Sequence, residues 1–192
     1  QASTPEAWGM DEYLQKAKDA GKNVLWTNHQ TPEWYRNTGR TDGNNDFAPI
    51  PAGTKRDDPK SFKDYASYLF QIAARYGSVK YPDSVLQVDP ESRWNGDLTE
   101  KKSGLNLLKY MECFNEEKWW LKGTEGYIEP ETMAAMMSAC YDAHENTLGE
   151  NVGIKTADSS IIVVMPGLTD FDMNYILAME IWFKANRKDK KW

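Results

Sequence analysis

Apolar residues recur at the helical period in four stretches of the chain. The clearest lies at 58–76, where Asp58 and Pro59 supply a cap and a first turn and apolar residues follow at helical spacing up to Gly77. Glycines also stand where two of the other stretches should end. The pattern predicts helices at 10–20, 58–76 and 129–148, and a last helix that carries Tyr175 to Phe183.

Three segments between these helices have the composition of strands. The first is Asn23–His29, which is apolar in its middle, and the second is Leu105–Phe114. The third, Ile161–Met165, is a continuous apolar run bounded by Ser160 and Pro166. Such a run is typical of a strand that is covered on both faces in a parallel sheet.

Helices and strands therefore alternate along the chain, which predicts parallel strands joined by right-handed crossovers. Two architectures have this order, a doubly wound open sheet and a (β/α)8 barrel, and periodicity alone does not separate them. No glycine-rich phosphate loop follows any of the three strands, so the main sign of a nucleotide-binding open sheet is missing. Residues 36–57 predict a long surface loop, and loops of that length are usually functional or mobile.

The composition is that of one globular domain. Of the 192 residues, 40% are hydrophobic and 27% are charged, which allows a sizeable core. The net charge of −6 argues against nucleic acid as a partner, because phosphate contacts need clustered lysine and arginine. No apolar stretch reaches the ~20 residues that span a bilayer, and the first residues lack a signal-peptide pattern, so we expect a soluble chain without membrane contact. The 8 Trp, 10 Tyr and 6 Phe suit sugar rings as well as a large core.

The sequence predicts neither a metal site nor a cofactor. Cys113 and Cys140 lack zinc-site spacing and are too few for a disulfide scaffold, and no carboxylate cluster has calcium-loop spacing. The two thiols are expected to be neighbours between the second strand and the following helix, as buried free thiols rather than a disulfide. His144 lies on the apolar side of that helix, where we expect a structural histidine with satisfied hydrogen bonds.

Acidic and aromatic residues gather where the second strand ends. With even-numbered positions facing a barrel interior, Glu116 would lie at the C-terminal rim, where such barrels build their sites. A carboxyl group there can protonate a leaving glycosidic oxygen. A glutamate at a strand end is more often solvated or salt-bridged, so the chemistry alone leaves both interpretations open. Strand alternation predicts Glu112, Phe114 and Glu116 on one face and Met111, Cys113 and Asn115 on the other.

The segment Tyr110–Glu116, followed by Trp119 and Trp120, resembles the fourth-strand motif of clan A glycoside hydrolases, in which Asn-Glu supplies the acid/base. The resemblance covers nearly the whole chain and is strongest to family 39-like enzymes, which include β-xylosidases and α-L-iduronidases. It implies a single domain, 1–192, of (β/α)8 barrel type with about three β/α units, and Glu116 as general acid/base. The other segments that match in order and spacing are Thr31–Trp34, Ala73–Gly77, Tyr127–Glu145 and Ala157–Gly167.

Two features depart from the family pattern. Glu117 stands where the family usually has proline, which changes the turn after the acid/base and places a second carboxylate beside it. The family's nucleophile is a glutamate at the end of the seventh strand, and we find no convincing nucleophile in this sequence. Retaining hydrolysis needs two carboxyl groups about 5 Å apart, and a barrel needs about 250 residues. We therefore expect the remaining part of the barrel, or another chain, as a partner.

Five residues are candidates for binding a carbohydrate substrate. By the resemblance, Asn115 binds a sugar hydroxyl next to the scissile bond, although an asparagine after a strand is also a common turn former. His29 falls at a strand end near the predicted rim, but a lone histidine is more often structural. Trp34, Trp119 and Trp120 are candidate stacking platforms, and at least one of the adjacent pair should belong to the core.

The leading hypothesis is that the intact protein is a retaining glycoside hydrolase that acts on a poly- or oligosaccharide and is secreted or periplasmic. The second hypothesis is a non-catalytic carbohydrate-binding relative or fragment of the same fold, in which the rim aromatics remain and the chemistry is lost. A small open-sheet protein of another activity is the third, and no residue pattern supports it specifically.

Overall fold

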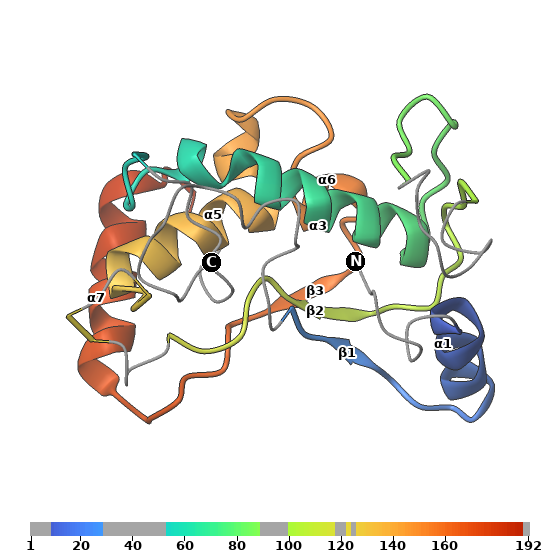
Figure 1. Ribbon diagram of the computed structural model, residues 1–192, viewed down its shortest axis with the longest axis horizontal. Coiled ribbons are helices and arrows are strands. Elements are labelled where there is room, and N and C mark those ends of the chain that lie inside the picture. Colours follow the sequence, from blue (N-terminus) through green and yellow to red (C-terminus); the bar gives the residue numbers. More distant parts are fainter. Residues whose placement is uncertain (1–8, 29–52, 89–99, 118–121, 124–125, 190–192) are drawn as a thin grey trace.

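The computed structural model describes residues 9–28, 53–88, 100–117, 122–123 and 126–189. This part is a mixed α/β fold with a three-stranded parallel sheet in the order β1-β2-β3. The predicted alternation of helices and strands is confirmed, with the 3-10 helix η2 and the short helix α6 added. None of the helices in these ranges has the length and hydrophobicity that a bilayer crossing requires. The elements are α1 Met10–Asp19, β1 Leu25–Trp26, η2 Pro59–Phe62, α3 Lys63–Tyr76, β2 Tyr110–Glu112, α5 Pro130–Asn146, α6 Ile154–Ala157, β3 Ile162–Val164 and α7 Met173–Asn186 (Figure 1).

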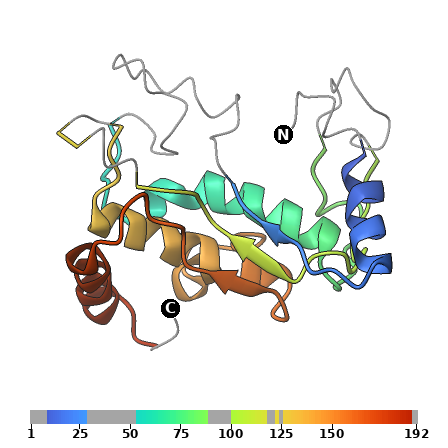
Figure 2. The same cartoon turned by 90° about the horizontal axis from the view of Figure 1, so that it is seen from below.

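Helices α3 and α5 cover one face of the sheet (Figures 1 and 2). The parallel register aligns Trp26, Met111 and Val163 across the three strands, so these residues share a face. The Trp26 ring stacks on Tyr76 of α3 with ring centroids 5.6 Å apart, and Met111 is fully buried. This face is therefore the one that packs against the helices.

The opposite face of the sheet carries Leu25, Tyr110 and Ile162 in one aligned row. Leu25 and Ile162 are each 45% exposed, and Met165, just beyond β3, is exposed as well. The prediction that Ile161–Met165 is covered on both faces is therefore wrong for the described part of the chain. The reason is that α3 and α5 lie on one side of the sheet only.

The strands are shorter than the sequence predicts. β1 covers two residues of the predicted Asn23–His29, and β2 ends at Glu112 rather than at Phe114. The alternation predicted beyond Glu112 is also wrong, because Phe114 is fully buried with its ring 6.3 Å from that of Tyr65 in α3. Strand pairing has stopped at this point, so the pleat no longer dictates which side each residue faces.

Two buried cysteines lie where the chain after β2 packs against α5. Cys113 and Cys140 are both buried and both free thiols, as predicted. Burial, reinforced by a hydrogen bond with Cys113, raises the pKa of the Cys140 thiol. Cys140 is thus a protonated packing residue rather than a reactive thiolate.

Arg187 fastens the end of α7 to α5. Its side chain is fully buried, and Nη2 lies 2.6 Å from Oδ2 of Asp142. Nη1 donates to Oδ1 of Asp142 at 2.9 Å and to Oγ of Ser138 at 2.7 Å. Ser138 Oγ also lies 2.8 Å from Nδ1 of His144, which agrees with the predicted structural role of this histidine. Residues 143–146 have positive φ, so α5 ends in a left-handed turn beside these contacts.

Asp158 joins the loops that precede β2 and β3. Its Oδ2 accepts hydrogen bonds from N and Oγ of Ser78 at 2.5 and 2.7 Å. Its Oδ1 accepts from N and Oγ of Ser160 at 2.8 and 2.6 Å. Gly77 packs directly against this group, because a Cβ at position 77 would lie 2.5 Å from the Ala73 carbonyl oxygen and 2.7 Å from Asp158 Oδ2.

Replacing Gly77 by alanine should lower the free energy of unfolding by about 1–3 kcal/mol, because the added methyl group meets a helix carbonyl that cannot shift freely. Gly9→Ala is the matched control, since a Cβ there has nothing within 4 Å. Urea unfolding of both variants measures the difference. Equal stability of the Gly77→Ala variant and the wild type would contradict the close contact.

The stability contributed by Asp158 should depend on pH. Burial acts to raise the pKa of Asp158, but the hydrogen bonds from Ser160 and Ser78 together outweigh it and lower the pKa below 3.8. The folded state therefore favours the carboxylate, so the contribution is complete above the unfolded-state pKa and is lost as the pH falls through the lower folded-state value.

Asp158→Asn should consequently be less stable than the wild type at about pH 7, and the difference should shrink as the pH falls below about 4. Unfolding midpoints measured across this range provide the test. A stability difference that stays constant down to the acid end would show that the charge on Asp158 is not responsible.

Candidate active site at the ends of the parallel strands

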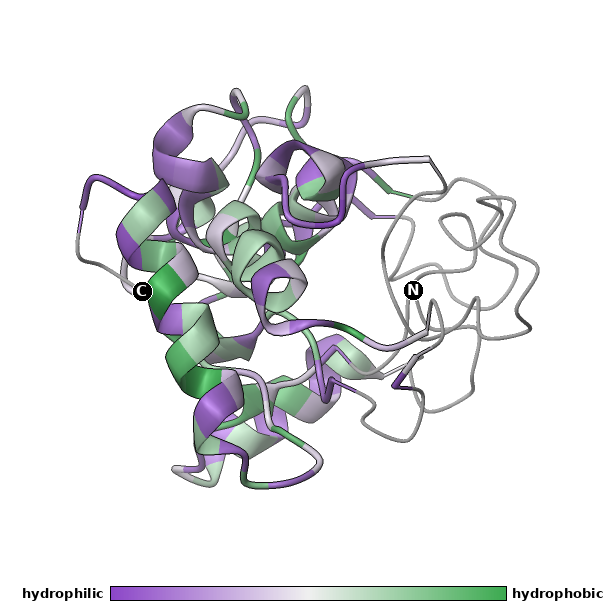
Figure 3. Cartoon of the chain, turned by 90° about the vertical axis from the view of Figure 1, so that its left-hand side faces the viewer, coloured by the Kyte–Doolittle hydropathy of each residue, from purple (hydrophilic) through white to green (hydrophobic). Residues whose placement is uncertain are grey.

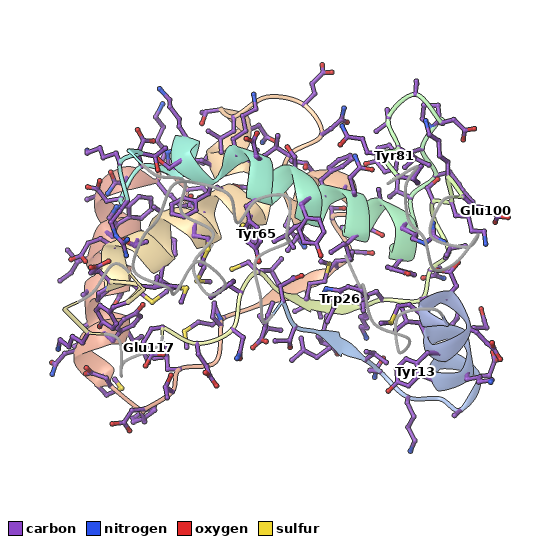
Figure 4. The ribbon with its side chains drawn as sticks, in the orientation of Figure 1. Tyr13, Trp26, Tyr65, Tyr81, Glu100 and Glu117 are labelled. Atoms are coloured by element: carbon purple, nitrogen blue, oxygen red, sulfur yellow. The ribbon has the colours of Figure 1, made fainter. Side chains whose placement is uncertain are left out.

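The candidate site lies where β2 and β3 end, close to the start of α7. Parallel strands of α/β folds present functional groups at their carboxyl ends, where the connecting loops meet. Glu117 lies at this end of the sheet, and Tyr81 and Glu100 lie at the opposite end (Figure 4). Asn115 and Glu116 directly precede Glu117, so the predicted motif lies at the carboxyl end of the sheet.

Glu116 has an unusual backbone conformation. Its φ is +57°, in the left-handed region that residues other than glycine rarely adopt. The backbone N–H donates to the carbonyl oxygen of Gly167 at 3.0 Å, and the side chain is partly exposed. The predicted strand alternation therefore does not extend to Glu116, because β2 ends at Glu112 and the chain turns.

The two carboxylates on either side of Glu116 are buried and bound to backbone. Glu112 is 7% exposed, and its Oε1 accepts from the N–H of Gly167 at 3.2 Å. Glu117 is 4% exposed, and its Oε2 accepts from the N–H of Thr169 at 2.8 Å. Both side chains therefore hold the loop between β3 and α7.

Two asparagines border the same region. Asn28 is buried at the end of β1, where its Nδ2 donates to the carbonyl oxygen of Glu112 at 3.0 Å and its Oδ1 accepts from Nε1 of Trp26 at 3.2 Å. Asn115 lies beside Gly167, since a Cβ at position 167 would be 3.5 Å from Asn115 Oδ1. Sequence reasoning missed Asn28, although its place at the end of a predicted strand was the available signal.

Two hydrogen bonds link Glu117 to Ile128 and Ile128 to Tyr175 of α7. The N–H of Ile128 donates to the carbonyl oxygen of Glu117 at 3.0 Å, and the hydroxyl of Tyr175 donates to the carbonyl oxygen of Ile128 at 2.8 Å. Burial, followed by the electrostatic influence of Tyr127 and of the Glu117 carboxylate, raises the pKa of Tyr175. Its hydroxyl thus stays protonated and remains a donor.

Arg56 holds the same segment from the other side. Its Nη2 donates to the carbonyl oxygen of Tyr127 and lies 2.8 Å from Oε2 of Glu129. Burial and then the charges of Glu117 and Glu129 raise the pKa of Tyr127. The region behind the candidate site is therefore acidic, with Arg56 bound at its edge.

Four of the predicted binding residues, His29, Trp34, Trp119 and Trp120, lie outside the described residues. Of the predicted site, the structure places Asn115 and Glu116, side by side at the end of β2. Within the described ranges, no group of three or more His, Cys, Asp or Glu side chains is arranged to hold a metal ion.

Comparison with models of protein families, with curated proteins and with solved structures finds no match to the chain. The fold and the site define a mixed α/β protein with acidic residues at the carboxyl ends of parallel strands. The resemblance to glycoside hydrolases receives no support from these comparisons.

Proposed function

We propose that the chain is part of a (β/α)8 glycoside hydrolase that cleaves a poly- or oligosaccharide with retention, using Glu116 as general acid/base. The observation that carries this proposal is the position of Glu116. Its partly exposed side chain stands at the end of a parallel strand, and its backbone N–H is bound to Gly167 of the next loop. A general acid needs such a fixed position to reach the leaving glycosidic oxygen. Asn115 beside it is the proposed ligand of a sugar hydroxyl.

The uncovered face of the sheet supports the barrel architecture. In a (β/α)8 barrel, helices cover the outside of the strands and rows of apolar side chains fill the interior. Leu25, Tyr110 and Ile162 lie on the face that would form this interior, where alternate strands contribute to each layer. Glu112 follows Tyr110 by two positions and so shares this face, nearer to the proposed rim.

Apolar surfaces beside β3 support a partner that completes the barrel. A groove of about 340 Å³ between β3, α5 and α7 has a mainly apolar lining that includes Val163, Met165, Ile176, Met179 and Phe183. Hydrophobic residues recur along α7 (Figure 3), and the exposed ones are Met173, Leu177 and Ile181. Exposed apolar side chains that gather in one region are typical of a surface that another part of a protein covers. The remaining part of the barrel, or another chain, is the proposed cover for these surfaces.

One observation favours a second candidate function for this chain by itself. The carboxylates of Glu112 and Glu117 are both buried and held by backbone N–H groups, so neither suits the role of nucleophile. Retaining hydrolysis requires a second carboxyl group about 5 Å from the acid/base. Carbohydrate binding without hydrolysis is therefore the second candidate.

In the intact barrel, Glu116→Gln should abolish hydrolysis while leaving sugar binding intact. The amide keeps the size of the side chain but cannot transfer the proton, and loss of general acid/base catalysis costs about 10²- to 10⁴-fold in rate. Release of the leaving group from an aryl β-xyloside measures hydrolysis. Tryptophan fluorescence during titration with xylo-oligosaccharides measures binding.

Glu131→Gln is the matched control, because Glu131 is an exposed glutamate in the first turn of α5. Hydrolysis that survives in Glu116→Gln would sink the acid/base assignment. Binding without hydrolysis by the wild type would favour the second candidate. Absence of both would contradict a carbohydrate-directed function.

The uncovered sheet face should bind the dye ANS in the isolated chain, and Ile162→Thr should reduce the fluorescence. Ile162 is 45% exposed, so its loss removes apolar surface and little packing. Threonine keeps the β-branched shape that strands favour, so the unfolding midpoint should stay close to that of the wild type. Equal ANS fluorescence of the two proteins would contradict an accessible apolar face.

A further inference from the structure

Glu117 connects three segments of the chain at the candidate site. Its carboxylate accepts the N–H of Thr169, in the loop before α7, at 2.8 Å. Its carbonyl oxygen accepts the N–H of Ile128, in the segment before α5, at 3.0 Å. With the side chain only 4% exposed, this carboxylate is directed into the protein and away from solvent. Glu117 is thus anchored through both its side chain and its backbone.

The residue before it is anchored to the same loop. The N–H of Glu116 donates to the carbonyl oxygen of Gly167, whose own N–H donates to Oε1 of Glu112. Three hydrogen bonds therefore run from residues 112–117 to residues 167–169. They lie on both sides of the one residue in this stretch whose φ is positive. A left-handed glutamate persists only where its surroundings restrain it.

We infer that Glu117 is a positioning residue that fixes the direction of the Glu116 side chain, and this inference rests on the proposed function of Glu116. Gly167 holds the N–H of Glu116, and Thr169 holds the side chain of the residue that follows. The peptide between Glu116 and Glu117 is thereby restrained at both ends. Glu117 restrains this turn through the hydrogen bond that its carboxylate accepts from Thr169.

Two substitutions separate the effect of the length of the Glu117 side chain from the effect of its charge. Glu117→Asp keeps the charge but is one methylene shorter, so it should no longer reach the N–H of Thr169. Glu117→Gln loses the charge but keeps an oxygen acceptor at the same distance. A positioning role depends on a side chain long enough to accept the Thr169 N–H. The glutamine variant should therefore behave like the wild type, and the aspartate variant should not.

Amide hydrogen exchange and the ¹³C chemical shift of the Glu116 carboxyl group, both measured by NMR, report this directly. In Glu117→Asp, exchange at Glu116 and Thr169 should be at least about tenfold faster than in the wild type, and the Glu116 carboxyl signal should shift. In Glu117→Gln, exchange at both amides should stay slow. Glu131→Asp, in the first turn of α5, is the control and should change neither observable.

A purely structural Glu117 would lower the unfolding midpoint of the aspartate variant without moving the Glu116 signals, and that result would overturn the inference. In an assay that measures hydrolysis, Glu117→Asp should lower kcat about 10- to 100-fold at nearly constant KM. Glu117→Gln should keep a kcat close to that of the wild type. Exchange and chemical shift need no substrate. These two measurements therefore test whether Glu117 positions Glu116, even if the sugar assays contradict the proposed function.

Discussion

The rest of the structure depends on one constraint, which is that the helices pack on one side of the parallel sheet. Parallel strands need crossover connections, and here α3 and α5 pack on the side that carries Met111. The carboxyl ends of the strands then meet at one end of the sheet, which brings Glu116 to the loop after β3. The same topology leaves Leu25 and Ile162 on the other face, although parallel sheets are normally buried on both. The candidate site and the uncovered face are two results of one arrangement.

Local patterns predicted the helices well because the signals that start and end a helix lie within it. Asp58 caps η2 by accepting the N–H of Lys60 at 3.0 Å, and α3 ends directly before Gly77, as the spacing predicts. The strand ends were not predictable in this way. β2 stops at Glu112, where its pairing with Val164 of β3 stops, and a partner 52 positions along the chain is not visible in a local pattern.

The candidate site was predictable in part for the same reason. A glutamate after an apolar strand can be read from the sequence, and so can its neighbour Asn115. The hydrogen bonds that hold the site cannot, because Glu112 and Glu117 bind backbone N–H groups of residues 55 and 52 positions away. Every residue except proline has such a donor, so the sequence offers no sign of which one is used. Strand alternation also gave the wrong geometry for Glu116, which has a left-handed φ and whose N–H binds the distant Gly167.

In the proposed hydrolase, the burial of Glu112 and Glu117 leaves the second catalytic group to another part of the protein. Glu112 shares the uncovered face with Ile162 and is the obvious candidate for a nucleophile by position. Its carboxylate is nevertheless 7% exposed and accepts the N–H of Gly167. Removing an acceptor from a buried donor costs about 1–3 kcal/mol, so Glu112 is better suited to holding the loop than to attacking a sugar. In the proposed barrel, the second carboxyl group therefore comes from the part of the protein that packs over the uncovered face. The same missing part would cover the exposed apolar residues and supply the nucleophile.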